Sequence, residues 1–156
     1  MAVILEGIVF VLLGIIAWKD SRTMEIPDEW NLAVAVCGVA AMFIEPEILI
    51  KDRLLGAICV SLPMYLMIVW IPESFGGGDV KLTFAMGLYL GVRRTLTGTF
   101  LAILIGGLYA VYLLASGKAK AGEGAHMAFG PALCIGFVVS RLWGDQILSW
   151  YFQLFY

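Results

Sequence analysis

Six apolar stretches, separated by short polar segments, determine what this 156-residue chain can fold into. A helix needs about 20 apolar residues to cross the roughly 30 Å hydrocarbon core of a bilayer, and most of the stretches approach that length. Hydrophobic residues make up 62% of the chain and charged residues 14%, against about 45–50% and 25% in soluble domains. We therefore predict an all-α, polytopic integral membrane bundle of about six helices, as one transmembrane domain over residues 1–156. The expected spans are about Val3–Trp18, Trp30–Ile44, Leu54–Ile71, Val80–Val92, Leu96–Ala115 and Met127–Trp143.

The charge balance and the cysteines exclude several classes of function. Ten basic residues against 12 acidic ones give a net charge of -2, whereas nucleic-acid binding requires clustered Lys and Arg. We expect no nucleic-acid partner. Cys37, Cys59 and Cys134 stand singly in apolar runs without the spacing of a zinc or redox pair, so we interpret them as small buried hydrophobic residues. No metal and no cofactor are expected.

The ends of the chain and its basic residues bear on membrane topology. The first 18 residues carry Glu6 and lack a basic n-region, so we expect them to remain as the first span and not as a signal peptide. The segment from Gly144 to Tyr156 suits either a continued last helix or an interfacial segment. The positive-inside rule gives no orientation, because the faces balance: Lys19, Arg22, Lys81, Lys118 and Lys120 against Lys51, Arg53, Arg93, Arg94 and Arg141.

Two acidic residues stand out by their place relative to the spans. Asp20 follows the first expected span and Asp79 precedes the fourth, so the two emerge on the same face whichever way the protein is inserted. The fourth span covers only about 20 Å, which places Asp79 below the membrane surface. An ionisable residue at such depth is a functional-site candidate. Two carboxylates on one face can bind a cation or share a proton to activate water.

Both residues also have ordinary structural interpretations. Asp79 suits a helix N-cap, and Asp20 suits an interfacial charge. The three glycines at positions 76–78 leave a backbone that an extended substrate could approach closely, or simply a flexible loop. Lys81 either favours the ionised form of Asp79 or marks the interface.

Other polar and small residues receive a structural interpretation. Asp28 and Glu29 follow Pro27 at the start of the second span, where acidic residues commonly cap a helix. His126, on the same face as the aspartates, could assist protonation but is more simply an incidental loop residue. The Gly87-x-x-x-Gly91 pattern and the glycines at 106 and 107 favour close helix packing.

Three motifs follow one another along the chain: Asp20-x-x-Thr23-x-x-Ile26-Pro27-Asp28-x-x-Asn31, Gly76-x-Gly78-Asp79-x-Lys81-Leu82 and Phe129-Gly130-Pro131-Ala132-Leu133. In order and spacing they resemble those of the type IV prepilin peptidases, a family of GxGD intramembrane aspartic proteases. The resemblance extends from the first expected span to the sixth. It implies that Asp20 and Asp79 are the catalytic aspartates, and that substrate approaches past Pro27, Gly76, Gly78, Lys81, Gly130 and Pro131.

The resemblance also implies a substrate, a partner system and a location. The substrate is a prepilin or pseudopilin, cut between a short basic leader and a hydrophobic helix, with pilus or secretion machinery nearby. The site faces the cytoplasm from the bacterial inner membrane. Ala128 and Asp28 stand where the family often has Pro and Asn.

The short form is similar to the peptidases of Flp/Tad-type pili. With Asp20 so early in the sequence, we expect cleavage without methylation. A small transporter or ion-conducting protein using buried acids, and a non-catalytic assembly subunit, are the alternatives.

Overall fold

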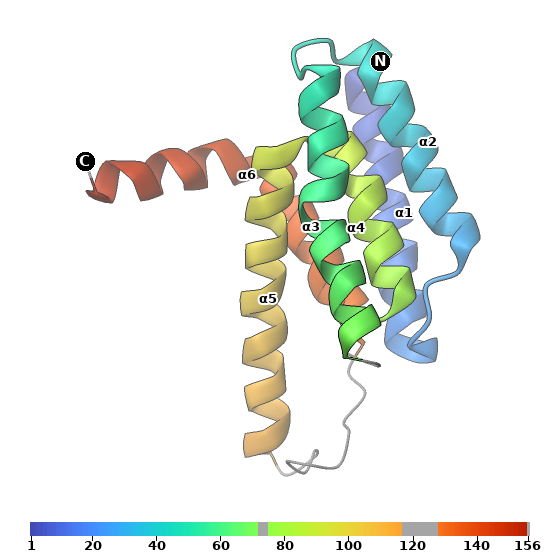
Figure 1. Cartoon of the computed structure of the whole chain (residues 1–156), viewed down its shortest axis with the longest axis vertical. Coiled ribbons are helices and arrows are strands. Elements are labelled where there is room, and N and C mark those ends of the chain that lie inside the picture. The colour runs from blue at the N-terminus through green and yellow to red at the C-terminus, as the bar shows by residue number, and fades with distance from the viewer. Residues whose placement is uncertain (72–74, 117–127, 156) are drawn as a thin grey trace.

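The computed structural model describes residues 1–71, 75–116 and 128–155, which form six helices and no strand. His126 and the two lysines at 118 and 120 lie outside the described residues. The helices stand side by side with α4 among them, and α5 extends past the ends of its neighbours (Figure 1). The helices are α1 (Ala2–Thr23), α2 (Asp28–Ile44), α3 (Ile50–Trp70), α4 (Gly77–Leu90), α5 (Val92–Ala115) and α6 (Gly130–Phe155).

The membrane character predicted from the apolar stretches is confirmed. Three helices, α1, α3 and α5, are long and apolar enough to cross a bilayer. Large apolar side chains cover the outside of the bundle, as expected for a surface that faces lipid. The shortest helix, α4, has 14 residues and therefore a length of about 20 Å, less than the roughly 30 Å of a hydrocarbon core.

The helix boundaries differ from the prediction where charged residues continue a helix. The helix α1 runs on to Thr23 and ends at Met24, which has a left-handed backbone with φ of 54°. Asp20 therefore lies inside the last turn of α1 and not after it. The helix α5 begins at Val92, so Arg93 and Arg94 belong to its first turn and do not form a loop. The break between α4 and α5 comes from Gly91, whose φ of 76° suits glycine.

Close packing around α4 depends on glycines. A Cβ added at Gly38 of α2 would lie 2.9 Å from the Cβ of Leu88, and one at Gly56 of α3 would lie 2.8 Å from the carbonyl oxygen of Gly87. The predicted role of Gly87 in close helix approach is confirmed. A Cβ added at Gly106 of α5 would likewise lie 2.9 Å from the ring of Phe129.

Gly107, in contrast, has nothing within 4 Å of an added Cβ, so the prediction of close packing is wrong for that residue.

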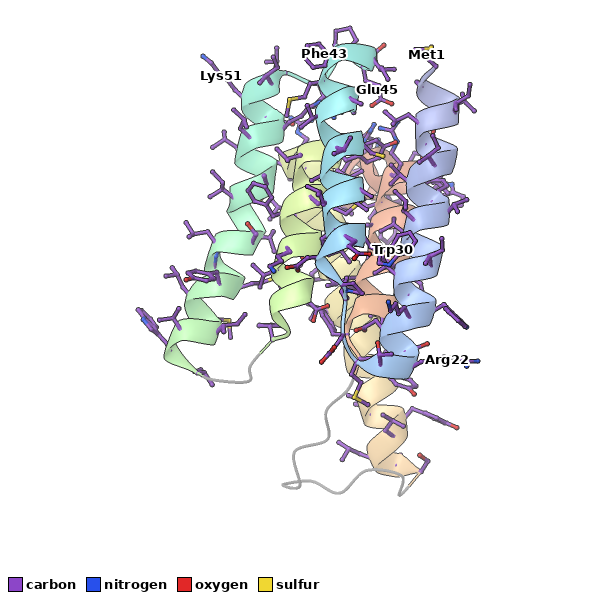
Figure 2. The ribbon with its side chains drawn as sticks, turned by 90° about the vertical axis from the view of Figure 1, so that its right-hand side faces the viewer. Met1, Arg22, Trp30, Phe43, Glu45 and Lys51 are labelled. Atoms are coloured by element: carbon purple, nitrogen blue, oxygen red, sulfur yellow. The ribbon has the colours of Figure 1, made fainter. Side chains whose placement is uncertain are left out.

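A charged cluster joins the helices at the end of the bundle that carries Met1, Glu45 and Lys51 in Figure 2; Arg22 marks the opposite end. Arg53 is fully buried and donates hydrogen bonds to the carbonyl oxygens of Leu88 (3.2 Å) and Tyr89 (2.6 Å) and to the backbone of Glu45 (3.1 Å). Arg53 therefore lies inside α3, at the same end of the bundle as Lys51, and not in the segment before the third helix as predicted.

Arg141 of α6 also pairs with Glu45, and its Nε lies 3.2 Å from Glu6 of α1. Arg53 of α3 and Arg141 of α6 thus meet at Glu45, the residue that follows α2, and Arg141 also reaches Glu6 of α1. These contacts tie four helices together at this end.

The aromatic tail continues α6 to Phe155. Its last turns leave the bundle at a steep angle and run past the start of α5 (Figure 1). Trp150, Tyr151 and Phe152 are exposed on it. Of the two expectations for the tail, the structure shows the continued helix.

Candidate active site

Asp20 is held at the end of α1 by the start of α6. Its side chain is buried, with 4% exposed. The backbone N–H of Gly130 donates a hydrogen bond of 3.0 Å to its Oδ2 atom. Gly130 and Pro131 form the first turn of α6, where proline fits because its missing N–H has no partner within the helix. The positive end of a helix thus faces a carboxylate, an arrangement that stabilises negative charge.

Asp79 lies in the first turn of α4 and is 7% exposed. Its backbone N–H donates to the carbonyl oxygen of Gly76 at 3.0 Å, and Gly76 is the N-cap residue of the helix. The interpretation of Asp79 as the N-cap is therefore wrong. A Cβ added at Gly76 would lie 3.1 Å from Oδ2 of Asp79, so that position leaves room for the carboxylate.

The structure brings Asp20 and Asp79 together. The two carboxylates interact electrostatically, and both interact with the buried thiol of Cys134, one turn into α6. Three helices, α1, α4 and α6, therefore converge on one acidic pair, at the bundle end that carries Arg22. The sequence argument that both residues share one end of the molecule is confirmed by this placement.

The loop after α1 packs against Gly78, at the start of α4. A Cβ at Gly78 would lie 2.8 Å from the Cβ of Ile26 and 3.2 Å from its carbonyl oxygen. The side-chain amide of Asn31 donates to the carbonyl oxygen of Gly78 at 3.4 Å. Pro27 follows Ile26 and precedes α2 with extended backbone. Gly78 thus serves packing between the two motifs, whereas an added Cβ at Gly77 would meet open space.

Lys81 points away from Asp79 and pairs with Asp28. Its Nζ atom lies 2.6 and 2.8 Å from the two carboxylate oxygens of Asp28, and both side chains are well exposed. Of the two interpretations of Lys81, the structure shows the interfacial one. Asp28 and Glu29 lie in the first turn of α2, as expected for acidic residues near a helix start. No side chain caps that helix by a hydrogen bond, so the carboxylate of Asp28 serves the ion pair.

Sequence reasoning missed the roles of Asn31, Ile26 and Cys134. Asn31 and Ile26 belong to the first motif, but only the fold shows that they contact Gly78. Cys134 was expected to be a buried apolar residue, and it is buried, yet it also borders the acidic pair. Cys37 and Cys59 are half-buried. Over residues 1–71, 75–116 and 128–155, no three His, Cys, Asp or Glu side chains gather closely enough to hold a metal ion.

The chain is similar in sequence to known proteins over most of its length. The type IV leader peptidase family matches residues 7–111, a range that contains both aspartates. A prepilin leader peptidase/N-methyltransferase of Bacillus subtilis is 31% identical over 95% of this chain and 59% of its own length. Proteins of the same name from Pectobacterium carotovorum and Pseudomonas aeruginosa are 32% and 29% identical, over 90% and 86% of this chain and 50% and 47% of their own.

The chain spans about half the length of the curated relatives it matches. No solved structure gave a significant match. The family matches about two thirds of the chain, and the apolar helices make it a multi-pass membrane protein. The chain therefore belongs to the type IV leader peptidase family.

Proposed function

We propose that the protein is an intramembrane aspartic endopeptidase that removes the leader peptide from type IV prepilin-like or pseudopilin substrates. Asp20 and Asp79 are its catalytic residues. The observation that carries this proposal is the pairing of two buried carboxylates from α1 and α4 beside the first turn of α6. The names of the curated relatives, prepilin leader peptidases, support the same activity.

In the proposed mechanism the two carboxylates share one proton, because two adjacent negative charges repel strongly in a site shielded from water. The ionised carboxylate takes a proton from water as the water oxygen attacks the scissile carbonyl carbon, and the protonated one donates to the carbonyl oxygen. The N–H of Gly130 stabilises negative charge on Asp20, which favours Asp20 as the first proton acceptor. Transfer of a proton to the peptide nitrogen then breaks the carbon–nitrogen bond and leaves a carboxyl and an amine.

The start of α4 leaves room for water and substrate to reach the acidic pair. Gly76 and Gly77 are exposed directly beside the buried carboxylate of Asp79. They carry no side chain that would block an extended peptide backbone on its way to the acidic pair.

The test is cleavage of a prepilin by the purified protein and by Asp20→Asn and Asp79→Asn. Each change keeps the size of the side chain but removes half of the acid–base pair, so cleavage should fall to background while the protein still inserts and folds. Glu25→Gln is the control, because it alters an exposed carboxylate in the loop after α1, at the same end of the bundle, and should keep substantial activity. A folded Asp20→Asn or Asp79→Asn variant that cleaves at near wild-type rate would refute the proposal.

The same purified protein distinguishes the proposed peptidase from the alternative, a small transporter. Wild-type protein that cleaves no prepilin, but conducts protons or cations across a liposome membrane, would replace the peptidase proposal with the transporter.

We also propose that the site faces the cytoplasm from the bacterial inner membrane. Single cysteines at Ser21 and Gly77, in a background lacking the native cysteines, should react with an impermeant thiol reagent from the cytoplasmic side. Single cysteines at Pro46 and Arg93 should react from outside. All four positions are exposed in the folded protein. Labelling of Ser21 and Gly77 from opposite sides would contradict a shared acidic pair.

A further inference from the structure

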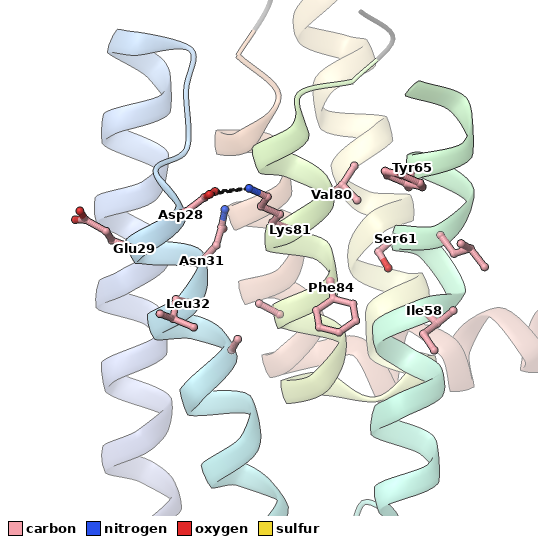
Figure 3. A pocket seen from close by; sticks show the side chains of 13 residues that line it. Asp28, Glu29, Asn31, Leu32, Ile58, Ser61, Tyr65, Val80, Lys81 and Phe84 are labelled. Carbon is pink, nitrogen blue, oxygen red and sulfur yellow. Dashed lines mark hydrogen bonds and ion pairs between the residues drawn. The ribbon is translucent and has the colours of Figure 1, made fainter. Parts of the chain in front are cut away.

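A large groove lies on the outer face of α4, between α2 and α3. It has a volume of about 960 Å³, within the range of ligand sites in proteins. Val80, Lys81 and Phe84 of α4 lie along it in Figure 3, with side chains of α2 on one side and of α3 on the other. Val80 directly follows Asp79, so the groove begins one residue from the acidic pair.

The groove opens toward the acidic pair because of how α2 and α3 pack on α4. At Gly38 and Gly56 both helices approach the last turns of α4 so closely that an added Cβ would clash. Toward the start of α4 the same helices leave its outer face uncovered, and Phe84 is 43% exposed. The groove is thus closed at one end by glycine contacts, and at the other end it extends to Val80, the residue after Asp79.

The chemistry of the groove changes along its length. Asp28, Glu29 and Lys81 line the end nearest Asp79, and together carry a net charge of -1. Asp28 pairs with Lys81, and the carboxylate of Glu29 is directed outward in Figure 3. Deeper along the groove the lining is apolar, with Leu32 of α2 and Leu62 of α3. This order fits a chain whose cationic segment precedes an apolar helix.

We propose that this groove binds the apolar helix of the substrate and so places the peptide bond in front of it at Asp20 and Asp79; this inference rests on the proposed function. A helix in a groove is recognised by the shape and the spacing of its side chains. In lipid, apolar contact alone gives little preference, because the lipid chains are equally apolar, so fit and the charged end set the affinity. The groove spans about two helical turns of α2, from Asp28 to Ala35, or about 10 Å.

The first experiment fills the groove and measures cleavage of a synthetic prepilin that carries its leader and its apolar segment. Ala35→Phe adds a ring within the lining of α2 and should raise KM at least tenfold, with kcat changed less than threefold. Val36→Phe adds a similar ring to the exposed neighbouring position outside the groove and should leave both constants within twofold. If both variants fold and change KM and kcat to the same extent, the proposal that the groove binds the substrate helix is wrong.

The second experiment needs neither cleavage nor added bulk on α2. A photoreactive phenylalanine replaces either Leu62, which lines the groove, or Met67, which lies outside it; they are similarly exposed, at 48% and 44%. The same prepilin, added to membranes, should cross-link at least fivefold more at position 62. Equal cross-linking at the two positions would reject the groove even if the enzyme cleaves. Selective cross-linking without cleavage would support the groove while rejecting the peptidase.

Discussion

Gly130→Ala is expected to impair the acidic pair without unfolding the protein. An added Cβ at this position would lie 2.6 Å from Oδ2 of Asp20 and 2.9 Å from its Cγ. Ordinary contact requires about 3.4 Å, so the carboxylate must retreat by about 0.8 Å. The hydrogen bond from the N–H of residue 130, now 3.0 Å, would then exceed hydrogen-bonding distance.

The size of the effect follows from that lost bond. A hydrogen bond to a charged group contributes about 1.5–3 kcal/mol, and about 1.4 kcal/mol changes a rate tenfold. If Asp20 is the group that must be positioned, kcat should fall by about ten- to a hundredfold. Displacement of a reacting group by about 1 Å has effects of the same order.

The assay is steady-state cleavage of a prepilin by purified Gly130→Ala, with its melting temperature recorded. Gly107→Ala is the matched control, because an added Cβ there has nothing within 4 Å, and it should retain full activity. A Gly130→Ala enzyme that melts like wild type and keeps kcat within threefold would show that the N–H of residue 130 does not position Asp20.

Three further variants test other contacts. Gly78→Ala should lower activity at least tenfold, because its Cβ would collide with Ile26, whereas Gly14→Ala, whose added Cβ has nothing within 4 Å, should be neutral; equal cleavage rates would contradict the packing argument. Arg53→Met should cost about 3–5 kcal/mol of stability by removing one partner from a buried charged cluster, and an unchanged melting temperature in detergent would disprove this. Lys81→Met breaks only an exposed pair, so thermal unfolding should show a loss below about 1 kcal/mol.

Sequence reasoning predicted the helices better than their ends. Hydropathy marks where apolar residues begin and stop, but a helix continues through charged residues as long as its backbone hydrogen bonds can form. Arg93 and Arg94 therefore begin α5, and the break falls at Gly91, whose backbone conformation hydropathy does not register. The same effect placed Asp20 within α1.

Pairing between distant side chains was harder to predict. The two aspartates could be assigned to one end of the bundle by counting spans, because that argument needs only the order of helices. The packing of the helices decides that Asp20 accepts the hydrogen bond from the N–H of Gly130. It also decides that Asp28 forms its ion pair with Lys81. The burial of Arg53 was not predicted for the same reason, since its partners lie on α4 and at the end of α2.

The bond between Asp20 and Gly130 joins residues 110 positions apart, which has a consequence for biosynthesis. At about 5–20 residues per second, the ribosome adds the start of the last helix roughly 5 to 20 s after the first aspartate. During that interval α1 and α4 can already be in the membrane, but the donor that holds Asp20 does not yet exist. The nascent chain is therefore expected to pass through the translocon without a complete acidic site, so a protein ending at Ser116 should insert and yet cleave nothing. Under the proposed function, late assembly of the acidic pair would keep the peptidase from acting on neighbouring proteins before α6 has been made.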